Sequence, residues 1–241
     1  MDDRDLVDRL RVALVNSQMD LAKWNSYYEG TQSLSYMAPE LQRELDGRVR
    51  QVVVNWPRLV VDSLEERLDV EGFRLSGQSR TDDRLWGWWQ ANGLDEASQQ
   101  AHIEALASRR AYVIVGSPDS PGDAPVITVE SATQVFAWHD PRTRKVTAAV
   151  KCWRDDSEAW QATLYLPDRT VWFTGVDRGG EWYSTMPGAG LRPTPAGIQP
   201  AGVTWQEVCV DYHDLGVVPV VPIVNRGRIL DQTGVSELAD I

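Results

Sequence analysis

Cys209, Asp211 and His213 are the residues whose types and spacing come nearest to a catalytic set. A thiol beside an imidazole can form a nucleophile and its base, which is the arrangement of Cys/His hydrolases. The odd spacing places all three side chains on one face of an extended strand. However, no glycine-rich elbow or other segment able to bind an oxyanion accompanies them. We therefore expect an ordinary strand face here and retain a Cys/His hydrolase as an alternative.

The other histidines offer little chemistry. His139 precedes Asp140 and Pro141, and Asp before Pro typically begins a turn. His102 falls on the polar face of a predicted helix, where a solvated imidazole is the ordinary state. None of the three histidines has the spacing of metal ligands, and no G-x-x-x-x-G-K-[ST] loop is present to bind the phosphates of ATP. We expect no catalytic residue, no metal site and no cofactor.

Eleven tryptophans raise a different possibility, because indole rings can stack on bases or sugars. Trp86 and Trp89 share a helical face with Leu85, which indicates core packing. Trp88 points elsewhere and is a candidate for contact with another subunit. Large aromatic residues on one face of a sheet are also what a core requires, so a Trp-rich ligand- or carbohydrate-binding β module stays open as another alternative. Its candidate residues are Trp138, Trp153, Trp160, Trp172 and Trp182.

Composition excludes several functions. The net charge is −11, and the acidic excess is divided almost evenly between the two halves of the chain. Without a basic patch, a protein that grips nucleic acid by neutralising phosphates is not expected. Two cysteines are too few for a disulfide framework, which favours a reducing compartment. No signal peptide and no run of 18 apolar residues is present, so we expect no membrane partner.

Helical periodicity covers the first half of the chain. The spacing of apolar residues predicts a helix over 4–28, ended by Gly30 in a left-handed cap, and Pro39 opens a short predicted helix that runs to Leu45. The remaining elements expected in this half are a short strand and turn over 70–77, a helix over 81–92 and a helix over 94–110 capped by Asp95.

Between them, Asn55 can cap a further helix, and Pro57 fits its first turn. The positions that we expect this helix to bury are Val60, Val61, Leu64 and Leu68.

From Ala111 the period of the pattern changes from about 3.6 to about 2 residues, which indicates strands. Turn-forming residues separate these strands, so consecutive strands are expected to pair as an antiparallel meander. A Gly/Pro-rich loop over 187–202 precedes a last strand over 203–212. The other expected strands cover 111–116, 125–130, 134–140, 145–153, 160–167 and 170–175.

These patterns predict an α+β fold in which an N-terminal helical segment packs on an antiparallel β meander. We divide the chain into a mainly helical part over 1–110, a β part over 111–212 and an arm over 213–241. The arm contains Pro219 and Pro222, whose missing N–H groups would face opposite edges of a strand, so a central strand is disfavoured. We expect an extended segment that joins two elements.

Three stretches of sequence carry more information than the periodicity. They are LAKWNSYYEGTQSL, VNWPRLVVDSLEERLDVEGFR, and HDLGVVPVVPIVNRG followed by TGVSELADI, whose start is typical of a capped helix. In this order they resemble the portal proteins of tailed double-stranded DNA phages, in the branch typical of siphoviruses of Gram-positive hosts. The residues that match the family's motifs are Tyr27, Tyr28, Gly30, Asn55, Val61, Asp62, His213, Gly216, Pro219, Pro222, Asn225, Arg226, Gly234, Ser236 and Glu237.

The resemblance implies a structural subunit without catalysis. It also implies that these 241 residues correspond to the wing, the outer part of a portal subunit. In the family, subunits form a ring, commonly of twelve, at one vertex of the capsid. Double-stranded DNA passes through the ring, driven by a separate terminase, and the ring later joins head to tail. The implied partners are other copies of the chain, the terminase, capsid or scaffold proteins and head–tail connector proteins. The implied locations are the virion and, during assembly, the host cytoplasm. Family members are about twice as long, so stem, clip, tunnel helix and crown are missing here.

Overall fold

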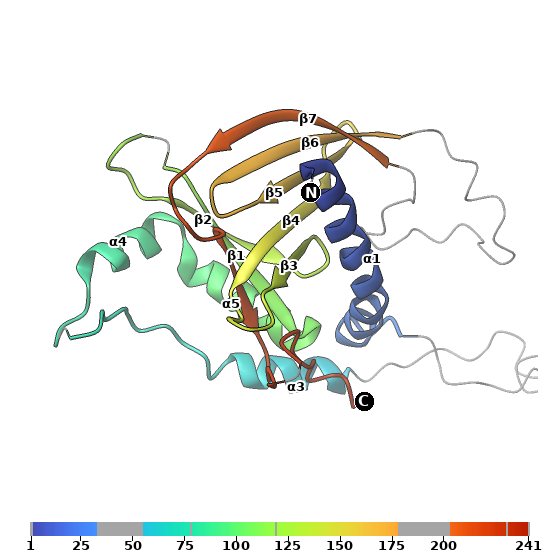
Figure 1. Cartoon of the computed structure of the whole chain (residues 1–241). Coiled ribbons are helices and arrows are strands. Elements are labelled where there is room, and N and C mark those ends of the chain that lie inside the picture. Colours follow the sequence, from blue (N-terminus) through green and yellow to red (C-terminus); the bar gives the residue numbers. More distant parts are fainter. Residues whose placement is uncertain are drawn as a thin grey trace, which may run out of the picture.

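The computed structural model describes residues 2–32, 55–77, 79–118, 120–177, 203–229 and 231–240. It has the predicted α+β class: helices precede and cover two antiparallel sheets (Figure 1). The short helix predicted over 39–45, the loop over 187–202 and Trp182 lie outside the described residues. No helix in the described part combines the length and the apolar character that crossing a membrane needs.

The first helix, α1 (Asp3–Tyr28), matches the helix predicted over 4–28. Its end also follows the prediction, because Gly30 has a φ of 70° in the left-handed region. At its start, the two guanidinium nitrogens Nε and Nη2 of Arg169 donate to the Asp3 carboxylate at 3.1 and 2.8 Å. This bidentate pair fastens the beginning of the helix to the larger sheet.

Three further helices are described: α3 (Trp56–Glu65), α4 (Asp83–Ala91) and α5 (Leu94–Ser108). The strand predicted within 70–77 is wrong, since residues 68–75 form no ladder with any described strand. The predicted cap of α5 is also wrong. Gly93 occupies the cap position, and Asp95 instead accepts a 2.7 Å hydrogen bond from the indole Nε1 of Trp89.

The strands form two sheets rather than the single meander that we predicted. The three-stranded sheet has the order β2-β1-β8, and the five-stranded sheet is a meander with the order β3-β4-β5-β6-β7. The break falls at a tight turn after β2, where Gln134 N donates to Ser131 O at 3.0 Å. Burial explains the break: the turn carries the fully buried Ala132 and leads β3 onto a face of the first sheet. The strands are β1 (Arg110–Gly116), β2 (Val126–Ser131), β3 (Val135–His139), β4 (Val146–Arg154), β5 (Trp160–Tyr165), β6 (Arg169–Asp177), β7 (Val203–Tyr212) and β8 (Val220–Val224).

Two apolar clusters hold these layers together. On one face of the five-stranded sheet, Leu10 and Leu14 of α1 pack against Leu164, Val171 and Phe173. On the opposite face, near the β3 end, the smaller sheet contributes residues such as Tyr112 and Val220. Figure 1 shows α1 lying along the larger sheet, with β1 and β8 beneath it. The larger sheet is therefore covered by α1 on one face and, near its β3 end, by the smaller sheet on the other.

The arm, in which we expected an extended segment and no central strand, contributes an edge strand. Among the described strands β8 pairs antiparallel with β1 only, and Pro222 stands opposite Tyr112. Asn225 N donates to Arg109 O at 2.9 Å, so alternation along the strand turns the missing N–H of Pro222 toward the open edge. A proline at an edge costs no ladder hydrogen bond, which is why the segment can pair on one side.

Candidate functional site

Matched motif residues from each of the three stretches, though not all of them, meet around the last turn of α5. Tyr28 ends α1, Asp62 lies on α3, and Ser236 belongs to the C-terminal segment. Leu238 and Val61 are 1 % and 0 % exposed and share one apolar cluster with Leu106 of α5. We call this assembly of α1, α3, α5 and the C-terminal segment the motif cluster.

The first connection in the motif cluster joins α1 to α3. The Tyr28 hydroxyl donates to Asp62 Oδ1 at 3.0 Å, and Asn55 Nδ2 donates to Tyr28 O at 2.8 Å. Asn55 also caps α3, because its Oδ1 accepts a 3.1 Å hydrogen bond from Arg58 N. The predicted cap is therefore confirmed, and its side chain additionally bridges the two helices.

A cation completes this connection. Arg58 Nε lies 3.2 Å from Asp62 Oδ2, and its guanidinium lies 5.4 Å from the centroid of the Tyr28 ring. Burial, the hydrogen bond to Asp62 and the charge of that carboxylate raise the pKa of Tyr28 to about 12. The phenol therefore remains protonated, as the donor that the geometry requires, at neutral pH.

The raised pKa of Tyr28 predicts a pH dependence of stability. Because the folded value of about 12 exceeds the ordinary value of 10.0, this contribution is complete below pH 10 and is lost as the pH rises toward 12. We expect the difference in unfolding free energy between wild type and Tyr28→Phe to shrink over that window. Urea unfolding at a series of pH values measures it. A difference that stays constant across the window would contradict the role of the phenol proton.

The second connection holds the C-terminal segment to β8. Asn225 Nδ2 donates to Val235 O at 2.8 Å and to Glu237 Oε1 at 3.0 Å. Arg226 Nη2 lies 2.7 Å from Glu237 Oε2. In the opposite direction, Val235 N donates to Asn225 O at 2.9 Å. The Asn-Arg pair of the motif thus fixes the chain that follows it.

The third connection joins the C-terminal segment to α5. Glu237 N donates to Leu106 O at 2.9 Å, and the Ser236 hydroxyl donates to Ala107 O. The same hydroxyl oxygen accepts from Leu238 N at 3.0 Å. Gly234 has a φ of 80°, and a Cβ there would lie 2.5 Å from Arg109 O. Only glycine allows the segment to approach α5 this closely.

Removing the Ser236 hydroxyl should weaken this connection measurably. Ser236→Ala leaves a buried carbonyl and a buried N–H without that partner, and we expect a loss of about 2 kcal/mol of unfolding free energy. Ser63→Ala is the matched control, because Ser63 makes the same kind of contact to a carbonyl, that of Val60, at an exposed position. Urea unfolding of both variants checks this. Equal losses would show that the buried contact does not matter.

The buried face of α3 differs from the prediction. Of the four apolar positions expected to be buried, only Val61 is buried, and Leu64 is half-buried. Val60 and Leu68 are 40 % and 46 % exposed. Among the described elements α3 packs against α1 and α5, and these two helices cover only part of its apolar surface.

Other matched residues lie outside the motif cluster or at its rim. His213 and Gly216 belong to the connection from β7 to β8, where His213 N donates to Asp168 O at 2.9 Å and Gly216 has a φ of 66°. Pro219 precedes β8, and its carbonyl accepts from Val115 N at 3.0 Å. Tyr27 is partly buried at the rim, next to Lys23.

The structure argues against a Cys/His nucleophile. Cys209 is exposed on β7 opposite Trp172, and the strand continues to Tyr212. At about 3.3 Å per residue, the four-residue separation puts the Cα atoms of Cys209 and His213 roughly 13 Å apart, which does not favour proton transfer between the two side chains. The ring nitrogen Nε2 lies 3.4 Å from Thr170 Oγ1 instead.

The tryptophans predicted for a ligand-binding sheet are split between its two faces. Trp160 is 5 % exposed in the cluster under α1, and Trp138 packs against that cluster. Trp153 and Trp172 alternate with core residues and therefore lie on the opposite face. Because neither face gathers more than two of the four described rings, no aromatic platform forms.

The helical tryptophans form a small cluster of their own. The rings of Trp86 and Trp89 stack with centroids 6.1 Å apart, and Phe73 packs against both. No residue of α4 is fully buried, so the predicted core packing is limited to this half-buried group. The guanidinium of Arg84 covers Trp88 at 4.6 Å.

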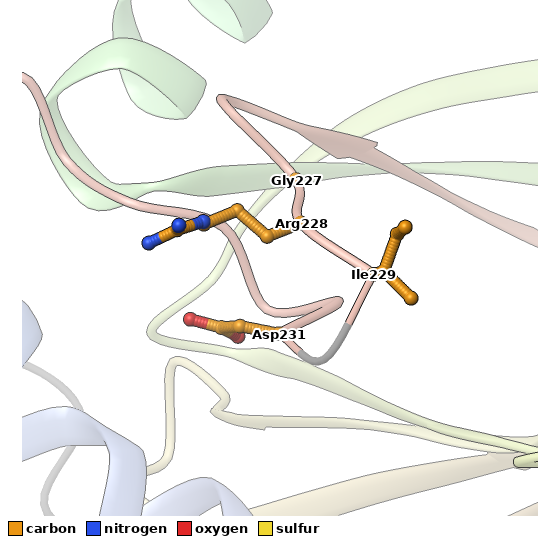
Figure 2. A pocket seen from close by; sticks show the side chains of 4 residues that line it. All are labelled: Gly227, Arg228, Ile229 and Asp231. Carbon is orange, nitrogen blue, oxygen red and sulfur yellow. The ribbon is translucent and has the colours of Figure 1, made fainter.

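A surface pocket beside the C-terminal segment is lined by Gly227, Arg228, Ile229 and Asp231. Figure 2 shows Arg228 and Asp231 extending to one side of the loop while Ile229 points away. Asp231 Oδ1 accepts hydrogen bonds from Thr233 N and Oγ1 at 2.9 and 2.6 Å, and the Thr233 hydroxyl lowers the pKa of that carboxyl. The carboxylate thus serves the turn. Within the described ranges no group of three His, Cys, Asp or Glu side chains could hold a metal ion.

Sequence reasoning missed the parts of the motif cluster that α5 supplies. The acceptors are the main-chain carbonyls of Leu106, Ala107 and Arg109. Because every residue type has a main-chain carbonyl, the sequence does not indicate which of them will accept a hydrogen bond. It also missed Arg110, which is 3 % exposed with its guanidinium 5.2 Å from the Phe136 ring. The sequence did contain a signal for this residue, because Arg110 is a cationic residue that directly begins the otherwise apolar run RAYVIVG.

The fold and the motif cluster define a class of protein: an α+β structural module whose matched residues connect its own elements rather than line a cleft. A family model described as phage portal protein, SPP1 Gp6-like, matches residues 17–240. The chain belongs to this portal protein family.

Two relatives show how much of such a protein the chain represents. A portal protein of Mycobacterium phage L5 is 33 % identical over 235 residues, which are 94 % of this chain and 43 % of the relative. A portal protein of Mycobacterium phage D29 is 32 % identical over 240 residues, which are 96 % of this chain and 44 % of the relative. The chain therefore spans less than half the length of these curated relatives.

Proposed function

We propose that this chain is the outer, wing portion of a portal subunit that assembles into a ring at one vertex of a phage capsid. The observation that carries the proposal is the convergence of the matched motif residues on one cluster, in a chain whose family match covers residues 17–240. In this view the wing consists of a mainly helical part over 1–110 and a β part over 111–212. Residues 213–241 lead from it toward a stem.

The motif cluster is the junction in this proposal. It ties the end of α1, the middle of α3 and the C-terminal segment to one turn of α5, so a load on the C-terminal segment reaches all three helices. Most of the contacts are hydrogen bonds whose acceptors are main-chain carbonyls or carboxylates. Such contacts hold a geometry and involve no reacting group, which supports a structural role without catalysis.

Double-stranded DNA is the proposed cargo of the assembled ring and not a tightly held ligand. The net charge of −11 supports this, because an acidic surface repels phosphates and lets a duplex slide. The proposed partners are further copies of the chain, the terminase, capsid or scaffold proteins and head–tail connector proteins. The proposed locations are the capsid vertex in the virion and the host cytoplasm during assembly.

Native mass spectrometry tests the proposal. We expect the 241-residue chain to be a monomer or a weak oligomer, because the contacts between stems are not part of it. A polypeptide of the relatives' full length, with this chain in place of the portion that it matches, should form a closed ring. A stable ring of the 241-residue chain would contradict the first expectation, and failure of the longer polypeptide to assemble would contradict the function.

DNA binding gives an independent check. In a gel-shift assay at about 0.15 M salt, we expect no retention of a duplex by the 241-residue chain, since no basic patch neutralises phosphates. Retention that falls steeply with salt would instead indicate that this chain binds DNA electrostatically. The proposal that a duplex slides past this portion without being held would then fail.

A further inference from the structure

Two consecutive arginines, Arg109 and Arg110, stand where α5 passes into β1. Arg110 is 3 % exposed, and its Nε and Nη2 atoms are buried without a hydrogen-bond acceptor among the described residues. The Nε atom of Arg109 is buried in the same way. A guanidinium group has five N–H donors, and a buried donor that stays unpaired costs free energy. These donors are therefore suited to a further acceptor.

Aromatic rings compensate only part of these two positive charges. The guanidinium of Arg110 lies 5.2 Å from the centroid of the Phe136 ring, and that of Arg109 lies 5.3 Å from the Trp24 ring. A cation over a ring gains less than a charge-assisted hydrogen bond gives. Burial lowers the pKa of Arg110, because desolvation penalises the charged form, but a guanidinium does not lose its proton in a protein. An anion beside Arg110 would offset this penalty.

Asp231 is the carboxylate that interacts with both cations. The Thr233 hydroxyl and, to a lesser extent, the charges of Arg109 and Arg110 lower the pKa of the Asp231 carboxyl. Its Oδ1 atom already accepts two hydrogen bonds from Thr233, at 2.9 and 2.6 Å. A single carboxylate thus balances two cations, and its hydrogen bonds serve its own turn.

Asp231 also lines the surface pocket of about 790 Å³ beside the C-terminal segment, which we call the Asp231 pocket. Arg228 lines the same pocket, and Figure 2 shows both side chains extending to one side of the loop. None of Arg109, Arg110 and Arg228 forms an ion pair with a carboxylate of the described residues. Three cations and one carboxylate leave a local surplus of positive charge, in a protein whose net charge is −11.

We propose that the Asp231 pocket binds a free inorganic oxyanion of the phosphate class through the guanidinium groups of Arg110 and Arg228. A phosphate group carries about −1.5 to −2 charges at neutral pH and offers three strong acceptor oxygens, which suits a surplus of positive charge. Arg110 supplies a buried donor, and Arg228 supplies one at the surface. The burial of Arg110 favours a free ion over the phosphates of a duplex, which could not approach it. The site goes beyond the proposed function and does not depend on it.

Thermal unfolding of the 241-residue chain tests the oxyanion site. Sodium phosphate at about 10 mM is compared with sodium chloride at the same pH and ionic strength, because phosphate also stabilises proteins without binding them. We expect phosphate to raise the melting temperature by roughly 4 °C, as a ligand at about ten times its dissociation constant would. Isothermal titration calorimetry should find one phosphate bound per chain. A short DNA duplex at the same phosphate concentration should give no shift.

Three substitutions locate the effect. Arg110→Met removes the buried donor and keeps the length of the side chain, so the shift in phosphate should disappear. In chloride this variant should melt no lower than wild type, because an apolar side chain replaces an unpaired buried cation. Arg228→Met should at least halve the shift. Arg142→Met is the matched control, because Arg142 is exposed on the turn between β3 and β4, and it should keep the full shift.

Two results would overturn the oxyanion site: a wild-type response to phosphate in Arg110→Met, or no bound ion in the calorimetry of wild type. If Arg110→Met does not fold, an undiminished shift in Arg228→Met decides against the site instead. A shift with the duplex as large as that with phosphate would also overturn it, because the arginines would then serve nucleic-acid phosphates. None of these measurements involves ring assembly, so their failure leaves the proposed function unaffected.

Discussion

Gly234→Ala is expected to destabilise the protein by about 4 kcal/mol, from a left-handed backbone penalty of about 1–2 kcal/mol and overpacking of about 1–3 kcal/mol. The backbone φ is 80°, where an L side chain is strained. The added Cβ would lie 2.5 Å from Arg109 O and 2.6 Å from Asn225 O. Both neighbours are main-chain atoms and cannot turn aside as a side chain could. The C-terminal segment would have to lift away from α5.

Gly216→Ala is the matched control, because Gly216 has a φ of 66° but a Cβ there would meet nothing within 4 Å. It should cost only the backbone part, about 1 kcal/mol. Urea unfolding of the two variants measures both losses. If they are equal, the close approach to α5 contributes nothing, and the role that we give the motif cluster fails. A longer subunit carrying Gly234→Ala should also form fewer rings.

Phe173→Ala should cost about 4 kcal/mol, the usual range for emptying a buried aromatic position being about 3–5 kcal/mol. Phe173 is 1 % exposed on β6 and packs in the cluster that includes Leu10 and Leu14 of α1. The cavity would open in the layer between helix and sheet. Because a 241-residue chain has limited total stability, we expect a fall of roughly 8–16 °C in melting temperature.

Two controls accompany this substitution. Phe173→Leu keeps most of the volume and should cost less than about 1.5 kcal/mol. Trp172→Ala removes a larger ring from the neighbouring position, but Trp172 is 37 % exposed on the other face and should cost less than Phe173→Ala. Calorimetry of the three variants gives the order. If Trp172→Ala proved the most damaging, the assignment of sheet faces would be wrong.

Local patterns were sufficient for most elements of the fold. The helix predicted over 4–28 is α1 (Asp3–Tyr28), and the strand predicted over 203–212 coincides with β7. Asn55 caps α3 as expected. Each of these depends on neighbours within a few residues, through hydrophobic periodicity, a capping side chain or a strand alternation. Interactions at that range depend on the types and spacing of neighbouring residues, so they can be predicted from the sequence.

Predictions that depended on distant partners were less successful. The strand predicted within 70–77 has no described strand beside it, and a strand without a partner leaves its backbone groups unpaired. The arm with Pro219 and Pro222 became β8 because β1 had one edge available. The single predicted meander became two sheets because the tight turn after β2 redirects β3.

The sequence by itself determined the α+β class, most helices and strands, and the motif residues that carry the resemblance to portal proteins, because these are properties of residue type and short-range order. Only the tertiary structure decided which of those residues meet. Tyr28 reaches Asp62 across 34 positions, and Ser236 reaches the carbonyl of Ala107 across 129. Whether such contacts form depends on how the layers pack, and main-chain acceptors leave no mark in the sequence.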